Sequence, residues 1–144
     1  MPLLPRVILS AALAVCASTA SADEIESGLW KVTTWIEQGG IIAPPQTSMK
    51  CLTPRETGDL ATTFSPVSRT INSDCAPLER NLNGKQLSWK LTCKGQLNME
   101  VTAAFVFDTP HHYTATIRNN ATMGGMQMVD TRTMIEAERV SKCD

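Results

Sequence analysis

Alternating apolar and polar residues run through most of the chain. The longest alternation lies within residues 97–107, where every second residue from Leu97 to Phe107 is apolar. Side chains on an extended chain alternate between two faces, so this pattern predicts a strand with one buried face. Similar but shorter patterns predict further strands at residues 29–37, 46–52, 78–82, 86–93, 113–117 and 127–143.

Turn-forming residues separate these predicted strands. Asn83-Gly84 is a strong hairpin signal, and residues 94–95 and 108–110 mark the next two turns. Residues 41–45 end in two prolines, which disfavour regular pairing and predict a loop. A second loop, rich in Met and Gly, is predicted from Asn119 onward. Most neighbouring strands are therefore expected to be antiparallel and joined by hairpins.

One short helix is predicted between the second and third strands. Thr53 is a suitable N-cap, Pro54 suits the first helical position, and Glu56 completes a capping box. Gly58 limits this helix to one or two turns, and residues 61–74 are predicted to be irregular. The predicted fold is mainly β: a single antiparallel, strongly curved sheet or a small up-and-down barrel, with one short helix after the second strand.

The first 22 residues have the pattern of a secretory signal peptide. Arg6 supplies a positive charge, and residues 7–17 form an apolar run too short to span a membrane. Cleavage after Ala22 is predicted to leave a soluble mature chain that begins at Asp23, with one domain over residues 23–144 and no transmembrane span. The alternative is lipidation of Cys16, but the β-branched Val15 before it fits a lipobox poorly.

Four cysteines remain after this cleavage: Cys51, Cys75, Cys93 and Cys143. An even number of cysteines in an exported chain predicts two disulfides, and three connectivities are possible. The Asn83-Gly84 turn lies midway between Cys75 and Cys93, which favours Cys75–Cys93 and, by elimination, Cys51–Cys143. When the apolar residues of the two strands are placed opposite each other, Cys75 and Cys93 are one residue out of register. We therefore predict an interruption of the ladder near Pro77.

Composition and charge exclude several classes of protein. The chain is 42% hydrophobic and 19% charged, which argues against extensive disorder, collagen and a membrane protein with several spans. After loss of Arg6, twelve Lys and Arg residues oppose 14 Asp and Glu residues. A net charge near −2 argues against a nucleic-acid partner.

Several segments together resemble a known family. They are GLWKVTT, QTSMKCLTP, SWKLTCKG, TMGGMQM and the cysteine next to the C-terminus, in this order along the chain. This order is similar to that of the domain of unknown function 3617 family. The resemblance implies a small exported protein of Gram-negative bacteria with a four-cysteine, β-rich domain and no assigned activity.

Catalysis is the least supported class of function. The histidines are the adjacent His111 and His112, whose side chains should diverge in a turn, so at most one could serve a given site. No nucleophile or metalloprotease motif accompanies them, and the cysteines are predicted to be oxidised. We therefore predict a non-enzyme with no cofactor, in which these histidines belong to a surface turn.

The Met-rich segment is the sharpest candidate site. Met123, Met126 and Met128 lie close together around two glycines, and thioether sulfur is a soft ligand that suits Cu(I). Met99 and the two histidines are possible neighbours of such a site. Methionine also fills cores and lines binding grooves, which is the more common role. The three tryptophans are expected to be core or edge residues.

The sequence therefore favours a periplasmic, non-catalytic β-domain protein. Its expected ligand is a small apolar molecule, a lipid or another envelope protein, bound on a concave sheet face with Met and aromatic residues. Cu(I) binding through Met123, Met126 and Met128 is the alternative. A purely structural envelope protein is a third reading.

Overall fold

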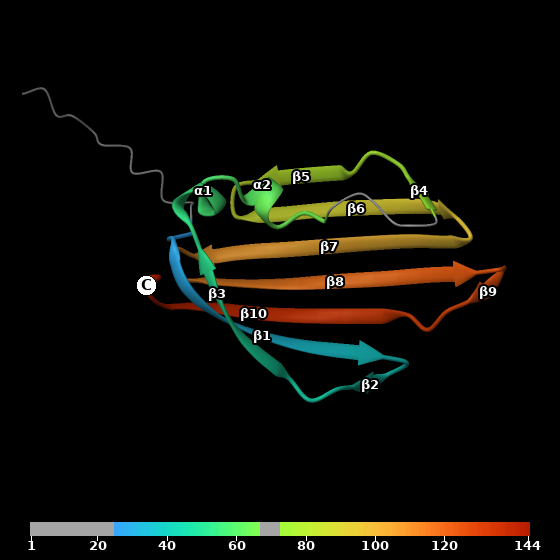
Figure 1. Ribbon diagram of the computed structural model, residues 1–144, viewed down its shortest axis with the longest axis horizontal. Helices are drawn as coiled ribbons and strands as arrows, with labels where there is room; N and C mark the ends of the chain where they lie inside the picture. The colour runs from blue at the N-terminus through green and yellow to red at the C-terminus, as the bar shows by residue number, and fades with distance from the viewer. Residues whose placement is uncertain (1–24, 67–72) are drawn as a thin grey trace, which may run out of the picture.

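The computed structural model describes residues 25–66 and 73–144, which form ten strands and two short helices (Figure 1). The strands are β1 (Gly28–Gln38), β2 (Ile41–Ile42), β3 (Gln46–Leu52), β4 (Ser73–Cys75), β5 (Glu79–Asn83), β6 (Gln86–Gly95), β7 (Leu97–Thr109), β8 (His112–Met123), β9 (Met126–Gln127) and β10 (Thr131–Ser141). The helices are α1 (Pro54–Thr57) and α2 (Leu60–Thr63). The predicted signal peptide, residues 1–22, with Cys16, and the predicted mature start at Asp23 lie outside the described residues.

All ten described strands belong to one antiparallel sheet. Its order is β2-β1-β10-β8-β7-β6-β4, with β3 also beside β1, β5 beside β6, and β9 beside β8. Within the described strands, no pairing joins the edge at β2 and β3 to the edge at β4 and β5. The prediction of a single antiparallel sheet is confirmed, and the barrel alternative is wrong because the sheet stays open.

The hydrophobic core covers one face of this sheet, which we call the core face. Phe64, which follows α2, lies with its ring centroid 5.1–5.4 Å from those of Phe105, Phe107 and Tyr113. Burial among these rings raises the pKa of Tyr113 to about 12. Trp30 is fully buried, and its indole Nε1 donates to the carbonyl of Glu26 at 3.1 Å. The opposite face of the sheet, which we call the open face, carries mainly polar and charged side chains, together with Trp35 and Val106.

The capping signals around Thr53 act as predicted. The Thr53 amide donates to Glu56 Oε2 at 2.8 Å, and the Glu56 amide donates to Thr53 Oγ1 at 3.3 Å. The prediction of a single helix is wrong, because α2 follows within the segment expected to be irregular. Its N-cap is Asp59, whose Oδ1 accepts from the Thr62 amide at 3.1 Å. Both helices follow the predicted strand at residues 46–52, which is β3 because Ile41–Ile42, predicted as part of a loop, pairs with β1 as a short strand.

The structure confirms both predicted disulfides, Cys75–Cys93 and Cys51–Cys143. In the β5–β6 hairpin Leu82 pairs with Leu87, whereas in β4 Cys75 pairs with Cys93. These two registers differ by one residue. The interruption lies between β4 and β5, around Pro77, as the apolar pattern predicts.

The segment from Asn119 to Gln127 differs from the predicted loop. Strand β8 continues through Met123, and Gly124-Gly125 then forms a tight turn into β9. Both glycines have positive φ angles, 58° and 80°, which fit a type I′ hairpin turn. Gly39-Gly40 makes a similar turn between β1 and β2, with φ angles of 59° and 80°. A Gly-Gly pair between extended residues is the signal that could have identified both hairpins.

Within the described ranges, no helix has the length and apolar character needed to cross a membrane.

Candidate functional site

Two features mark one end of the sheet as the candidate site: a group of exposed apolar side chains and a charged cavity beside them. The apolar group comprises Ile41, Ile42, Met123, Met126, Met128 and Val129, and we call it the apolar end. These are six of the eleven large hydrophobic residues that are exposed in the described chain. In Figure 1, β2 and β9 lie at the same end of the sheet, away from the helices.

The two hairpins of the apolar end are neighbours. A side-chain carbon added at Gly39, in the β1–β2 turn, would lie 3.5 Å from Val129 Cγ1, in the segment that follows β9. That segment is held to β8 by the Met128 amide, which donates to the carbonyl of Ala121 at 2.8 Å. Residues 38–49 and 119–129, which include both turns, carry no charge. The one charged residue paired within these hairpins is Glu37, the register partner of Ile42, and its carboxylate forms an ion pair with Arg132.

The Met residues predicted as a metal site lie within this end. Met123 and Met126 are register partners across the β8–β9 turn, and Met128 follows two residues later. All three are exposed, so the structure does not assign them to the core.

Of the other residues named as possible neighbours of a Met site, Met99 lies near it and the two histidines do not. The Met128 amide donates to the carbonyl of Ala121, the register partner of Met99. Met99 pairs with Cys93 on β6 and Ala121 on β8, and its side chain packs against the core. His111 and His112 precede and begin β8, whereas Met123 ends it. The two histidines are therefore at the far end of that strand from the Met residues, and their expected proximity is wrong.

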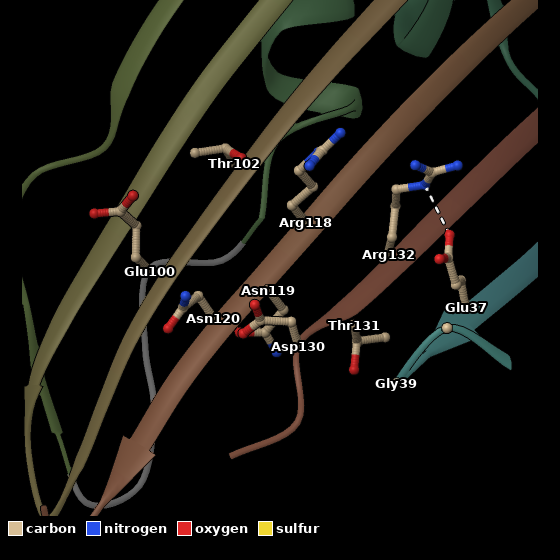
Figure 2. Close-up of a pocket in the computed structure, with 11 residues that line it drawn as sticks. Glu37, Gly39, Glu100, Thr102, Arg118, Asn119, Asn120, Asp130, Thr131 and Arg132 are labelled. Carbon is tan, nitrogen blue, oxygen red and sulfur yellow. Dashed lines mark ion pairs between the residues drawn. The ribbon is translucent and has the colours of Figure 1, made fainter. Parts of the chain in front are cut away.

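The cavity lies on the open face beside the apolar end and has a volume of about 580 Å³. Its floor is a row of register partners that crosses four strands, from Glu37 on β1 to Arg132 on β10, Arg118 on β8 and Thr102 on β7. Figure 2 shows this row, with the guanidinium groups of Arg118 and Arg132 pointing the same way from adjacent strands. Gly39, Asp130 and Thr131 border the cavity on the side of the apolar end.

Most charges around the cavity are paired. Arg132 Nε lies 3.2 Å from Glu37 Oε2, although the geometry makes this an ion pair without a hydrogen bond. Lys90 Nζ lies 3.0 Å from Glu100 Oε2, and this hydrogen bond raises the pKa of Lys90. Among the described residues, Arg118 and Asp130 have no ion-pair partner; Asp130 Oδ1 accepts only from Gln127 Nε2, at 3.3 Å. Arg118 is thus the cation of the cavity, and Asp130 the anion, that has no ion-pair partner among the described residues.

Sequence reasoning missed this cavity. Arg118 and Arg132 are far apart in sequence, and only the pairing of β8 with β10 places them opposite each other. Glu100 and Asp130 are exposed, as is ordinary for charges on the solvated face of a sheet, but their position around a common cavity depends on the sheet order. No group of three or more His, Cys, Asp or Glu in the described ranges is arranged to hold a metal ion.

His112 forms a separate polar cluster at the opposite end of β8. Its Nδ1 lies 2.7 Å from Asp108 Oδ1 and its Nε2 lies 3.3 Å from Glu136 Oε1. The bond to Asp108 is the main cause that raises the pKa of His112 above 6.5, and the bond to Glu136 adds to it. The same bond to His112 lowers the pKa of Asp108 below 3.8. The His111 and His112 turn is exposed or half-buried, as predicted.

These shifts predict a pH-dependent contribution to stability. The raised pKa of His112 means that its protonated form stabilises the fold fully below pH 6.5, and this contribution is lost as the pH rises through the folded-state value. The lowered pKa of Asp108 means that its contribution is lost only as the pH falls below 3.8. We expect His112→Gln to reduce the loss of stability that the wild type shows as the pH rises above 6.5, measured by urea unfolding. An unchanged pH profile in His112→Gln would refute this linkage.

Comparison with known proteins identifies the family. The family model described as Protein of unknown function (DUF3617) matches residues 25–143, which include every described strand and both disulfides. The chain belongs to this family. Neither a search of curated proteins nor a search of solved structures found a match.

Proposed function

We propose that this protein is a periplasmic, non-catalytic domain that docks on lipid through its apolar end. The observation that carries this proposal is the gathering of six exposed apolar side chains on two tight hairpins at one end of the sheet. Exposed apolar side chains gathered in one region of a globular domain are typical of a binding site. The two disulfides support an oxidising compartment outside the cytoplasm.

The shape of the apolar end favours a lipid surface over an enclosed apolar ligand. All the aromatic residues except Trp35 are packed in the core, several of them around Phe64; Trp35 lies on the open face among charged and polar side chains. The cavity on the open face is lined mainly by charged and polar side chains, which suit an apolar molecule poorly. By contrast, hairpin tips with Ile and Met can insert at the depth of the headgroups, where the polar groups of their turns still reach water.

Binding to lipid vesicles tests this proposal. We expect the mature protein to sediment with vesicles of mixed phosphatidylethanolamine and phosphatidylglycerol. The double variant Met123→Ser/Met126→Ser should bind about tenfold more weakly or worse, because it removes apolar area that burial in lipid would stabilise. Met49→Ser is the matched control: Met49 on β3 is 52% exposed, the same as Met123, but it lies outside the apolar end. An equal loss of vesicle affinity in the double variant and in Met49→Ser, or no vesicle binding by the wild type, would contradict the proposal.

Cu(I) binding through the same methionines is the second candidate. The observation in its favour is that the β8–β9 turn places Met123 opposite Met126, with Met128 two residues further along. The triple Met→Leu variant separates the two functions, because leucine keeps the apolar volume but removes the thioether sulfurs. Lipid docking predicts that this variant still binds vesicles. A saturable Cu(I) complex of the wild type that the variant loses would favour the copper function.

A further inference from the structure

We propose that the open-face cavity binds a zwitterionic headgroup in which a phosphate is joined to a primary ammonium, as in phosphatidylethanolamine. This inference rests on the proposed function, because it identifies the lipid that the apolar end would meet. Its independent basis is the distribution of charge around the cavity.

The phosphate would lie between Arg118 and Arg132. These residues are direct register partners on β8 and β10, and like charges placed opposite each other destabilise an antiparallel pair. Arg118 has no ion-pair or hydrogen-bond partner among the described residues. Arg132 is held in place by Glu37 and by its Nη2, which lies 3.3 Å from Met134 Sδ. A phosphate could accept hydrogen bonds from both planar guanidinium groups and relieve their repulsion.

The ammonium would lie near Asp130. Asp130 lies two positions before Arg132, directly before β10, and its carboxylate borders the same cavity as the two arginines. Glu37 and Glu100 are already engaged by Arg132 and Lys90, so they leave Asp130 as the unpaired carboxylate of the cavity. A ligand with a single negative charge would satisfy Arg118 alone. A zwitterion satisfies Arg118 and Asp130 together.

The position of the cavity agrees with a lipid ligand. Gly39 and Gly40 belong to the β1–β2 turn, and Asp130 and Thr131 directly follow the apolar Met128 and Val129. Both sets border the cavity and adjoin the apolar end. Ile42 is the register partner of Glu37, so a headgroup held between the arginines would leave its acyl chains beside the exposed β1–β2 hairpin.

Two probes test this assignment: soluble glycerophosphoethanolamine, followed by calorimetry or NMR, and vesicles whose phosphatidylethanolamine is replaced in equal amount by phosphatidylcholine or phosphatidylglycerol. We expect saturable binding of the soluble probe, and tighter binding to vesicles that contain phosphatidylethanolamine. Arg118→Gln and Asp130→Asn should each weaken probe binding about tenfold, as expected for loss of one charge-assisted hydrogen-bonded contact. The matched controls Arg55→Gln on α1 and Asp74→Asn on β4 change the same charges on exposed residues away from the cavity and should bind normally.

The outcomes separate this inference from the proposed function. If vesicle binding requires the apolar end but changes neither with the headgroup nor in Arg118→Gln, the headgroup assignment is wrong and lipid docking still holds. Probe binding that Arg118→Gln and Asp130→Asn abolish, without binding to any vesicle, would support the cavity site for a free zwitterion and overturn lipid docking. If Arg118→Gln loses probe binding and Asp130→Asn keeps it, the ligand is a simple anion and the assignment of a zwitterion is wrong. Binding to neither probe would overturn both proposals.

Discussion

Replacement of Cys51 and Cys143 by serine should lower the free energy of unfolding by about 4.6 kcal/mol, in the chain-entropy treatment of a long closed loop. The two cysteines are 92 residues apart in sequence, so the bond between them restricts most of the unfolded chain. It also fastens the edge strand β3 to the segment after β10, on either side of β1. Urea unfolding of the double variant and the wild type measures the difference.

The second disulfide provides the control. Cys75 and Cys93 are only 18 residues apart, and their double serine variant should lose about 3 kcal/mol. The order of the two effects follows from loop length alone. A larger loss from the Cys75–Cys93 pair would contradict that explanation and place the main contribution in the folded state.

Phe107→Ala should be among the most damaging single substitutions in the core, with a loss of about 3–5 kcal/mol. Phe107 is almost fully buried, and its ring lies 5.3 Å from that of Phe64 and 5.7 Å from that of Tyr113. Alanine would leave a cavity at the point where the segment after α2 meets the sheet, and the surrounding rings could close it only in part.

Val106→Ala is a suitable comparison for this substitution, because Val106 is the preceding residue on β7 and is exposed on the open face. We expect it to cost under about 1 kcal/mol. Thermal or urea unfolding of both variants tests the assignment of faces. Similar losses in the two variants would show that β7 does not bury one face as the alternation requires.

The parts of the fold that sequence predicted are those set by local signals. Period-two alternation identified β7 and the first and last long strands, and the Thr53 capping box identified α1. The hairpin at Gly84 and the apolar register of β5 and β6 were enough to predict the Cys75–Cys93 pair and its ladder interruption. These signals depend on a few neighbouring residues, so they remain visible without any tertiary structure.

The parts that sequence missed depend on contacts between distant segments. Alternation alone cannot distinguish an open sheet from a closed one, because both bury one face of each strand. The second helix has only four residues, and its Asp59 cap is the one local signal for it. Asn119 and Asn120 suggested a loop by propensity, but pairing with β7 keeps β8 extended as far as Met123.

The candidate site was only partly predictable for the same reason. The Met residues were found because they are close in sequence, whereas Ile41 and Ile42 join them only through the arrangement of two hairpins. The opposition of Arg118 and Arg132 follows from the β8–β10 register. A sequence pattern can nominate such residues singly, but their shared end and shared cavity come from the sheet order.

Methyl NMR of the mature protein with vesicles that contain a spin-labelled lipid tests lipid docking most directly. The methionine methyl groups report on surfaces inside and outside the apolar end. Met123, Met126 and Met128 lie in the apolar end, and Met49 is exposed on β3. We expect vesicles to broaden the signals of the first three and to leave that of Met49 sharp. Equal broadening of all four signals, selective broadening of Met49, or no broadening at all would contradict lipid docking through the apolar end.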